Sequence, residues 1–314
     1  MKQVEPTVRR GVGLALGTAL ISGLAVYLNA FGVRTVPDPV VYTTAKNLVA
    51  ALVLLGVALS LPGRVTWPSP RTRDGVGLLA IAVVGGSIPF VLFFSGLAIA
   101  TAPTAAFIHK TLFVWVALLA VPLLGERLGV VPIVALAGLL AGQAFVAPPT
   151  GFGIGPGEVM IGIATAFWSV EVILARRLLA RVPVRTLAVA RMALGSLVLV
   201  GYVALSGRLG VVGSIGAEGW LWIALTGVVL AGYVATWYGA LRDAPATVVT
   251  SVLVVGAVVT GGLSALTGGV VPNPTVVAGY LVIVGAVALI VLATTGALGA
   301  VGAVVRSSRA RARA

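Results

Sequence analysis

The sequence predicts an all-α integral membrane protein with ten transmembrane helices, arranged as two inverted five-helix repeats. Three observations predict this class. Of the 314 residues, 59% are hydrophobic and 9% are charged, whereas charged residues make up about a quarter of an ordinary soluble protein. The apolar residues recur in runs of roughly 20, which is the length that crosses a bilayer as a helix. A pattern of residues in the first half also returns in the second half.

The ten helices follow one another with short connections, so neighbours are expected to run antiparallel. They are predicted at 11–31, 39–61, 75–99, 102–124, 128–147, 156–179, 184–206, 217–241, 244–266 and 274–295. Proline and glycine mark most of the joints, as at Pro37 and Pro39 before the second helix and at Pro183 before the seventh. Pro89 lies within the third helix and is expected to free a backbone carbonyl and to kink that span.

Basic residues are divided unevenly between the two predicted sides of the membrane. One side carries Lys2, Arg9, Arg10, Arg64, Arg71, Arg73, Arg127, Arg176, Arg177, Arg181, Arg185, Arg242, Arg306, Arg309, Arg311 and Arg313. The other side carries Arg34 and Arg208. Because cytoplasmic loops are enriched in Lys and Arg, we expect a multi-pass protein of the cell membrane with both termini in the cytoplasm. Topology then explains the net charge of +13 without a nucleic-acid partner.

The two halves of the chain match at a nearly constant spacing. The matching pairs are Gly17 with Gly162, Lys46 with Arg191 and Gly56 with Gly201, each at an offset of 145, and Pro103 with Pro245 at an offset of 142. The predicted units are residues 1–149, residues 150–299 and a basic cytoplasmic tail at 300–314. Two consecutive units with an odd number of spans must cross the membrane in opposite senses. Transporters built in this way bind their substrate near the midplane, between the units.

These features resemble the EamA family of the drug/metabolite transporter superfamily. The resemblance is carried by a proline and a basic residue in the second helix of each half, by an Ala-Pro pair before the fourth helix of each half, and by "LLGERL" at 123–128. Glu126 stands at the glutamate of that motif; an offset of 142 places Gly268 at the matching point of the second half. Lys46 stands where the family more often has arginine. The resemblance implies a secondary carrier of small metabolites, often an exporter, and leaves the substrate open.

Several function classes do not fit the composition. The chain has no cysteine and one histidine, so disulfides, thiolate metal sites and histidine-cluster metal sites are not expected. The eight acidic residues stand singly, and no phosphate-binding loop motif is present. An intramembrane protease using Ser264 and His109 lacks the flanking pattern. We therefore expect no enzyme and no cofactor, with a small-molecule substrate and the lipid bilayer as partners and a homodimer left open. An uncoupled facilitator is the alternative to a coupled carrier.

Five ionisable residues lie within predicted spans, where a charge costs several kcal/mol, from about 2.5 upward. Glu171 and Arg191 lie on consecutive helices at matching depth, roughly 8–9 Å inside the cytoplasmic ends. The two residues are expected to form a structural ion pair. Alternatively, Glu171 is the carboxyl group that couples transport to protons.

Lys46 and Lys110 lie about 10 Å below the outer surface, and no acidic residue is expected in the same half of the membrane except near the loops. We predict that Lys110, assisted by Lys46, binds the anionic part of a substrate such as an amino acid. Lys46 has the alternative of binding backbone carbonyls at a helix break. Lys110 has the alternative of extending its ammonium group to the outer surface. His109 is about 100° around the helix from Lys110 and is expected to hydrogen-bond a neighbouring helix.

Aromatic residues near these charges are candidates to line a substrate cavity. Trp168 is one helical turn before Glu171, and Tyr233 and Trp237 share a face of the eighth helix. Ordinary helix packing or anchoring at the membrane interface is the alternative for each of them. Two glycine pairs are expected to permit close helix approach. They are Gly13 with Gly17 and Gly138 with Gly142.

Overall fold

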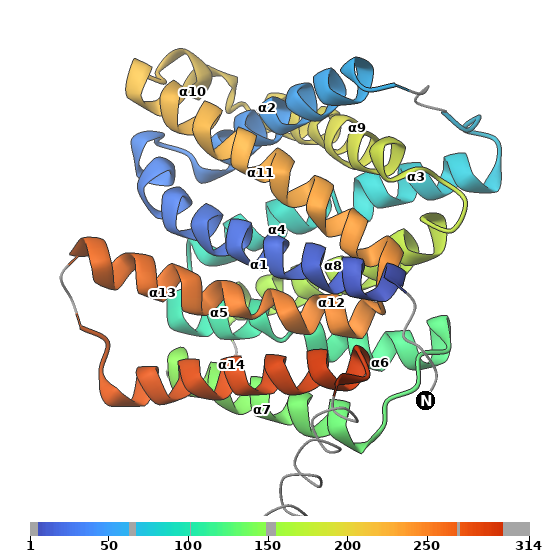
Figure 1. The fold of residues 1–314 in the computed structure, drawn as a ribbon. Coiled ribbons are helices and arrows are strands. Elements are labelled where there is room, and N and C mark those ends of the chain that lie inside the picture. Colours follow the sequence, from blue (N-terminus) through green and yellow to red (C-terminus); the bar gives the residue numbers. More distant parts are fainter. Residues whose placement is uncertain (1–5, 63–66, 101, 149–154, 269–270, 298–314) are drawn as a thin grey trace, which may run out of the picture.

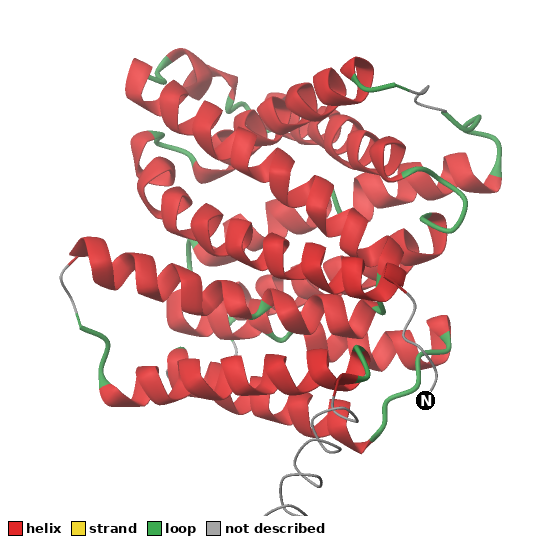
Figure 2. Ribbon diagram, viewed as in Figure 1, coloured by secondary structure: helices red, strands yellow, loops and turns green. Residues whose placement is uncertain are grey.

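The computed structural model describes residues 6–62, 67–100, 102–148, 155–268 and 271–297, and the described residues form helices and connecting loops without a strand (Figures 1 and 2). The predicted tail at 300–314 lies outside the described residues. The first half contains α1 (Pro6–Gly32), the short 3-10 helix η1 (Val33–Thr35), α2 (Pro39–Ser60), α3 (Arg73–Val84), α4 (Ile88–Leu97), α5 (Ala102–Lys110), α6 (Leu112–Leu124) and α7 (Val130–Val146). The second half contains α8 (Pro156–Leu178), α9 (Val184–Leu205), the short α10 (Leu209–Gly213), α11 (Ala217–Asp243), α12 (Ala246–Leu253), α13 (Val255–Gly268) and α14 (Pro274–Thr294).

The predicted spans are found in their predicted order. Nine spans among the described residues are long and apolar enough to cross a membrane. The remaining one, α7, is shorter at 17 residues, which corresponds to about 25 Å of helix and lies at the lower limit for a crossing. Most observed ends lie within a few residues of the predicted ends, because the joints contain proline or capping residues. Asp38 illustrates this: its side chain accepts hydrogen bonds from the first amides of α2.

Three of the predicted spans are interrupted. The third span consists of α3 and α4, the fourth of α5 and α6, and the ninth of α12 and α13. At the fourth, the Thr111 hydroxyl donates to the carbonyl of Ile108, 2.6 Å away. At the ninth, the hydroxyls of Thr250 and Ser251 donate to carbonyls of the preceding turn. Such bonds from hydroxyl to backbone often accompany bends in helices, and they occur next to the interruption in the fourth helix of each repeat.

The two halves pack reciprocally. The first helix of the first half, α1, packs on the third and fourth helices of the second half, α11, α12 and α13. The first helix of the second half, α8, packs on the corresponding α3, α4, α5 and α6. The second helices, α2 and α9, pack against each other, as do the fifth helices, α7 and α14 (Figure 1). This exchange of partners is the arrangement expected of two inverted repeats around a common axis.

Contacts between helix ends show that arginine gathers at one end of the bundle. Arg10 of α1 pairs with Asp243 of α11, Arg181 after α8 pairs with Asp74 of α3, and Arg185 of α9 donates to the carbonyl of Pro62 after α2. We call this the arginine-rich end; it lies at the right of Figure 1, where α1 begins and α14 ends. The described arginines at this end are Arg9, Arg10, Arg71, Arg73, Arg127, Arg176, Arg177, Arg181, Arg185 and Arg242. Arg34 and Arg208 lie at the opposite end.

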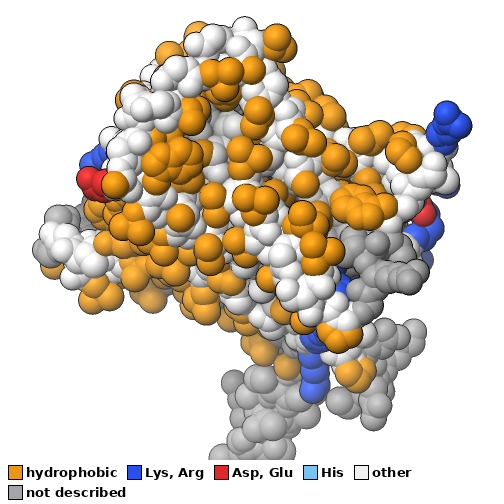
Figure 3. Space-filling model, turned by 90° about the horizontal axis from the view of Figure 1, so that it is seen from above, with side chains coloured by type: hydrophobic (Ala, Val, Ile, Leu, Met, Phe, Trp, Pro, Cys, Tyr) orange, Lys and Arg blue, Asp and Glu red, His pale blue; other side chains and the backbone are white. Residues whose placement is uncertain are grey.

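The outside of the bundle is apolar and the helix contacts inside are close. Large hydrophobic side chains such as Leu52, Leu118 and Leu221 are exposed, and orange side chains are spread across the face shown in Figure 3, with charged side chains at its edges. An apolar exterior of this extent fits a lipid environment. Of the predicted glycine pairs, Gly138 and Gly142 face α14 closely. The prediction for Gly13 and Gly17 is wrong, because no neighbouring helix approaches the points where their Cβ atoms would lie.

Candidate functional site

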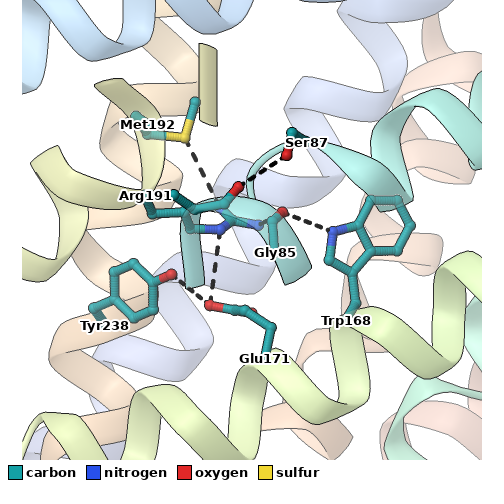
Figure 4. Close-up of polar contacts among 8 residues, drawn as sticks. Gly85, Ser87, Trp168, Glu171, Arg191, Met192 and Tyr238 are labelled. Atoms are coloured by element: carbon teal, nitrogen blue, oxygen red, sulfur yellow. Dashed lines mark hydrogen bonds and ion pairs between the residues drawn. The ribbon is translucent and has the colours of Figure 1, made fainter. Parts of the chain in front are cut away.

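The candidate site begins at the break between α3 and α4. Pro89 has no amide hydrogen, so the carbonyl four residues earlier, that of Gly85, loses the hydrogen bond that a continuous helix would give it. The indole Nε1 of Trp168 donates to this carbonyl oxygen over 3.2 Å, and Nη2 of Arg191 donates to it over 3.1 Å (Figure 4). Both donors come from the second repeat. The sequence predicted the freed carbonyl, and the structure shows that the other repeat satisfies it.

Glu171 lies beside this carbonyl. Its Oε1 is 3.7 Å from Nε of Arg191 and accepts a hydrogen bond from the hydroxyl of Tyr238 (Figure 4). Glu171 and Arg191 are 2% and 6% exposed. Because a buried charge without compensation is costly, the proximity of Arg191 and the hydroxyl of Tyr238 is what allows a carboxylate here. We call Gly85, Trp168, Glu171, Arg191 and Tyr238 the polar network.

Two glycines allow the break to fit between α8 and α9. A Cβ atom at Gly85 would overlap Cγ of Glu171. A Cβ atom at Gly86 would lie 2.5 Å from the carbonyl oxygen of Arg191 and 3.1 Å from Cα of Gly195. At the break, backbone without side chains therefore faces α8 and α9 of the second repeat. For this reason the side chains of Trp168 in α8 and Arg191 in α9 reach the Gly85 carbonyl directly.

An aromatic cluster adjoins the polar network through Trp168. The ring of Trp168 contacts Phe90 at 5.4 Å, Phe93 at 5.6 Å and His109 at 5.0 Å between centroids, and Phe93 also contacts His109 and Phe94. The aromatic cluster thus joins α4, α5 and α8. The expectation of a hydrogen bond from His109 to a neighbouring helix is wrong for its Nδ1, which is buried without a partner among the described residues. Ring contacts hold the imidazole instead.

Lys46 lies on the other side of the aromatic cluster. Its Nζ donates to Oδ1 of Asn29 over 3.1 Å and lies 5.6 Å from the ring centroid of Tyr42 and 6.0 Å from that of Phe94. These distances suit cation–π contact. Lys46 is 6% exposed, and no carboxylate pairs with it in the described part of the chain. The first repeat therefore holds a buried cation with an amide and two rings as its neighbours.

The other predicted site residues are Lys110, Tyr233 and Trp237. Lys110 is half-buried at the end of α5 and makes no hydrogen bond, ion pair or ring contact with the described residues. Tyr233 and Trp237 stack on each other with centroids 6.0 Å apart, and Trp237 is buried in the main apolar core. The structure therefore groups Lys46, His109, Trp168, Glu171 and Arg191. It also places Tyr233 close enough to Glu171 and Arg191 to interact with them electrostatically, and it leaves Lys110 without a fixed partner among the described residues.

Sequence reasoning missed the hydrogen-bond partners Tyr238 and Asn29 and the rings of Phe93 and Phe94. Tyr238 and Asn29 were not predicted, although a tyrosine hydroxyl or an amide inside an apolar helix needs a partner. The Phe93 and Phe94 rings gave no distinctive signal, because aromatic residues are common in membrane helices. The family glutamate, Glu126, accepts hydrogen bonds from the backbone amides of Ala246 and Thr247 in the opposite repeat.

Comparison with known proteins decides the family. The EamA-like transporter family matches the chain twice, at residues 9–147 and 155–292. The chain belongs to this family. A solved crystal structure shares 21% sequence identity with this EamA protein at a TM-score of 0.76, covering 90% of this chain and 98% of that one; at this identity the likeness concerns the fold. A comparison with curated proteins gave no match. Among the described residues no group of three His, Asp or Glu is placed to hold a metal ion.

Proposed function

We propose that this EamA protein is a secondary transporter that moves small metabolites by alternating access, working as an exporter. The observation that carries the proposal is the break at Gly85 in the first repeat, which is held by Arg191 and Trp168 from the second. Discontinuous helices at the contact between inverted repeats are where such carriers bind substrates. The break, the aromatic cluster and two buried basic residues occupy this contact.

The substrate class in this proposal is anionic or zwitterionic, as for an amino acid. Lys46 has no carboxylate partner in the part of the chain that the structure describes, whereas the carboxylate of Glu171 lies near Arg191. A substrate carboxylate can therefore supply the charge that Lys46 lacks. His109 and Trp168 supply the apolar side of the site. Lys110 keeps its proposed role as a second ammonium group on the outer side of the site, supported by its lack of a fixed partner among the described residues.

Glu171 is proposed as the proton-coupling residue or, alternatively, as half of a structural ion pair. Its position supports both readings, because one carboxylate oxygen touches Tyr238 and faces Arg191, and Arg191 in turn holds the break. A change in charge at Glu171 would reach the Gly85 carbonyl through Arg191. Uptake against a gradient that a protonophore collapses supports coupling, and passive equilibration supports the facilitator.

The proposed location is the cell membrane, with both termini in the cytoplasm. The support is the gathering of described arginines at the end where α1 begins, which the positive-inside rule assigns to the cytoplasm. Because the chain contains no cysteine, single cysteines report this directly. Ser60→Cys at the arginine-rich end and Ser214→Cys at the opposite end should react with an impermeant maleimide from opposite sides of the membrane.

The transport test uses proteoliposomes loaded with labelled amino acids and small carboxylic acids. Wild-type protein should release a subset of them faster than empty liposomes. Lys46→Glu and Lys110→Glu should each reduce the release of anionic solutes at least tenfold while the protein still inserts. Arg34→Glu, a charge reversal on an exposed arginine away from the site, serves as the matched control and should leave release unchanged. Unaltered release by both lysine variants would end the anion-site proposal.

A further inference from the structure

The end of α6 is shaped so that Glu126 reaches the opposite repeat. Gly125 has φ +69°, a left-handed conformation that glycine adopts without strain. The amide of Glu126 then bonds back to the carbonyl of Ala120 over 3.2 Å. The chain therefore reverses directly after the helix, and the next side chain points away from α6. This gives "LLGERL" a physical meaning: the glycine ends the helix and aims the glutamate.

The carboxylate of Glu126 caps the fourth helix of the second repeat. Oε1 accepts from the amide of Ala246 over 2.6 Å, and Oε2 accepts from the amide of Thr247 over 3.2 Å. The first amides of a helix have no partner within the helix, and the positive end of the helix dipole attracts an anion. Ala246 and Thr247 are almost completely buried. Glu126 therefore satisfies amides that the second repeat leaves without a partner.

A second hydrogen bond joins the end of α6 to the second repeat, and here the second repeat supplies the donor. Nη2 of Arg177, at the end of α8, donates to the carbonyl of Leu123 in the last turn of α6 over 2.6 Å. The end of α6 is thus bonded to the second repeat by both its carbonyl and its following carboxylate. A cavity of about 350 Å³ borders the joint and is lined by Glu126, Arg127 and Thr247 among others.

At the opposite end of the bundle, the described residues form no equivalent carboxylate cap between the repeats. The position that matches Glu126 at the offset of 142 is Gly268, at the end of α13, and a glycine has no side chain to cap the first repeat. Links between the repeats at that end include the ion pair of Asp38 with Arg208, the hydrogen bonds of Tyr27 with Thr267 and of the buried Tyr42 with Thr226, and the stacked rings of Phe31 and Trp222. These are contacts between side chains, and none of them is a carboxylate bound to the first amides of a helix. The repeats are therefore fastened unequally at their two ends.

We propose that Glu126 is a positioning residue that latches the arginine-rich end closed, and that its bonds to α12 must break when the transporter opens at this end. This proposal rests on the alternating-access function proposed above. Opening at one end requires the fourth helices of the two repeats to separate there. The Glu126 bonds are the contacts that such a separation would stretch, since they join the end of one fourth helix to the beginning of the other.

The test is thiol labelling of a buried reporter. Ser251 lies one turn beyond Thr247 in α12 and is fully buried, and the chain contains no native cysteine. Ser251→Cys should react slowly with an impermeant maleimide applied at the arginine-rich end. Adding Glu126→Gln should raise the labelling rate about tenfold, because a charge-assisted bond to buried amides is lost. Glu126→Asp keeps the carboxylate on a shorter stem and should give an intermediate rate.

Two controls separate the latch from general loosening. Glu158→Gln removes a carboxylate that caps the amide of Gly155 within one repeat, and it should leave Ser251→Cys protected. Ser60→Cys, exposed at the same end, should label at one rate in every background. Slow labelling of Ser251→Cys with Glu126→Gln overturns the latch. Fast labelling in a protein that shows no transport would support the latch and count against the proposed transport function.

Discussion

The two repeats have a basic residue at the same position of their second helix, but the neighbours of these two residues differ. Arg191 in the second repeat faces Glu171 and donates to the Gly85 carbonyl. Lys46 in the first repeat has the neutral amide of Asn29 as its hydrogen-bond partner. The offset of 145 places Val26 opposite Glu171 and Gly23 opposite Trp168, so the first repeat has no acid or indole at these points. The two repeats therefore have the same helix arrangement. Arg191 stabilises the contact between them, whereas Lys46 carries a charge that no carboxylate among the described residues balances.

The largest expected effect distinguishes the two bases by stability. Arg191→Ala would leave Glu171 as a buried carboxylate without its cation and would remove one donor from the Gly85 carbonyl. Loss of one partner of a buried pair costs about 3–5 kcal/mol. Lys46→Met keeps the volume of the side chain and removes a buried charge that pairs with no carboxylate among the described residues, so we expect it to change the free energy of unfolding by less than about 1 kcal/mol. The measurement is thermal or denaturant unfolding in mixed micelles. Equal losses for the two variants would contradict the comparison.

A smaller difference in the free energy of unfolding is expected between substitutions of Tyr238, near Arg191, and of Tyr42, near Lys46. Tyr238→Phe removes a hydrogen bond to a charged carboxylate, which is worth about 1.5–3 kcal/mol. Tyr42 exchanges hydrogen bonds with Asn29 and Thr226, which are neutral, and Tyr42→Phe should cost about 0.5–1.5 kcal/mol. The same unfolding measurement checks the order of the two values. A larger loss at Tyr42 would mean that the first repeat carries the more demanding polar group.

The sequence predicted the spans, their order and the repeat because each depends on local and repeated signals. Apolar runs, proline and glycine joints, and a spacing of 145 residues are visible without a structure. The break before Pro89 was also predictable, since a proline always frees the carbonyl four residues earlier. The interruptions near Thr111 and Val254 were not, because hydroxyl bonds to the backbone leave most helices continuous.

The candidate site was predicted in part for the same reason. Glu171 and Arg191 could be paired from helix order and depth, since charges inside a membrane need partners. The inclusion of the Gly85 carbonyl depends on how α3 and α4 cross α8 and α9, and a backbone acceptor has no mark in the sequence. The separation of Lys110 from Lys46 was hidden as well, because equal depth says nothing about the direction in which a helix presents a side chain.

The smallest expected effect concerns matched glycines at which the two repeats should behave alike. Gly17 and Gly162 stand at equivalent positions of the first helices, and no neighbouring atom lies within 4 Å of the Cβ that alanine would add at either. Glycine inside a helix costs about 0.5–1 kcal/mol relative to alanine, so Gly17→Ala and Gly162→Ala should each stabilise the protein by about that amount. Gly23→Ala is the contrasting control, because its Cβ would lie 2.5 Å from Cβ of Val259 on α13. Destabilisation by only one of the matched pair would show that the repeats differ in helix packing as well as in charge.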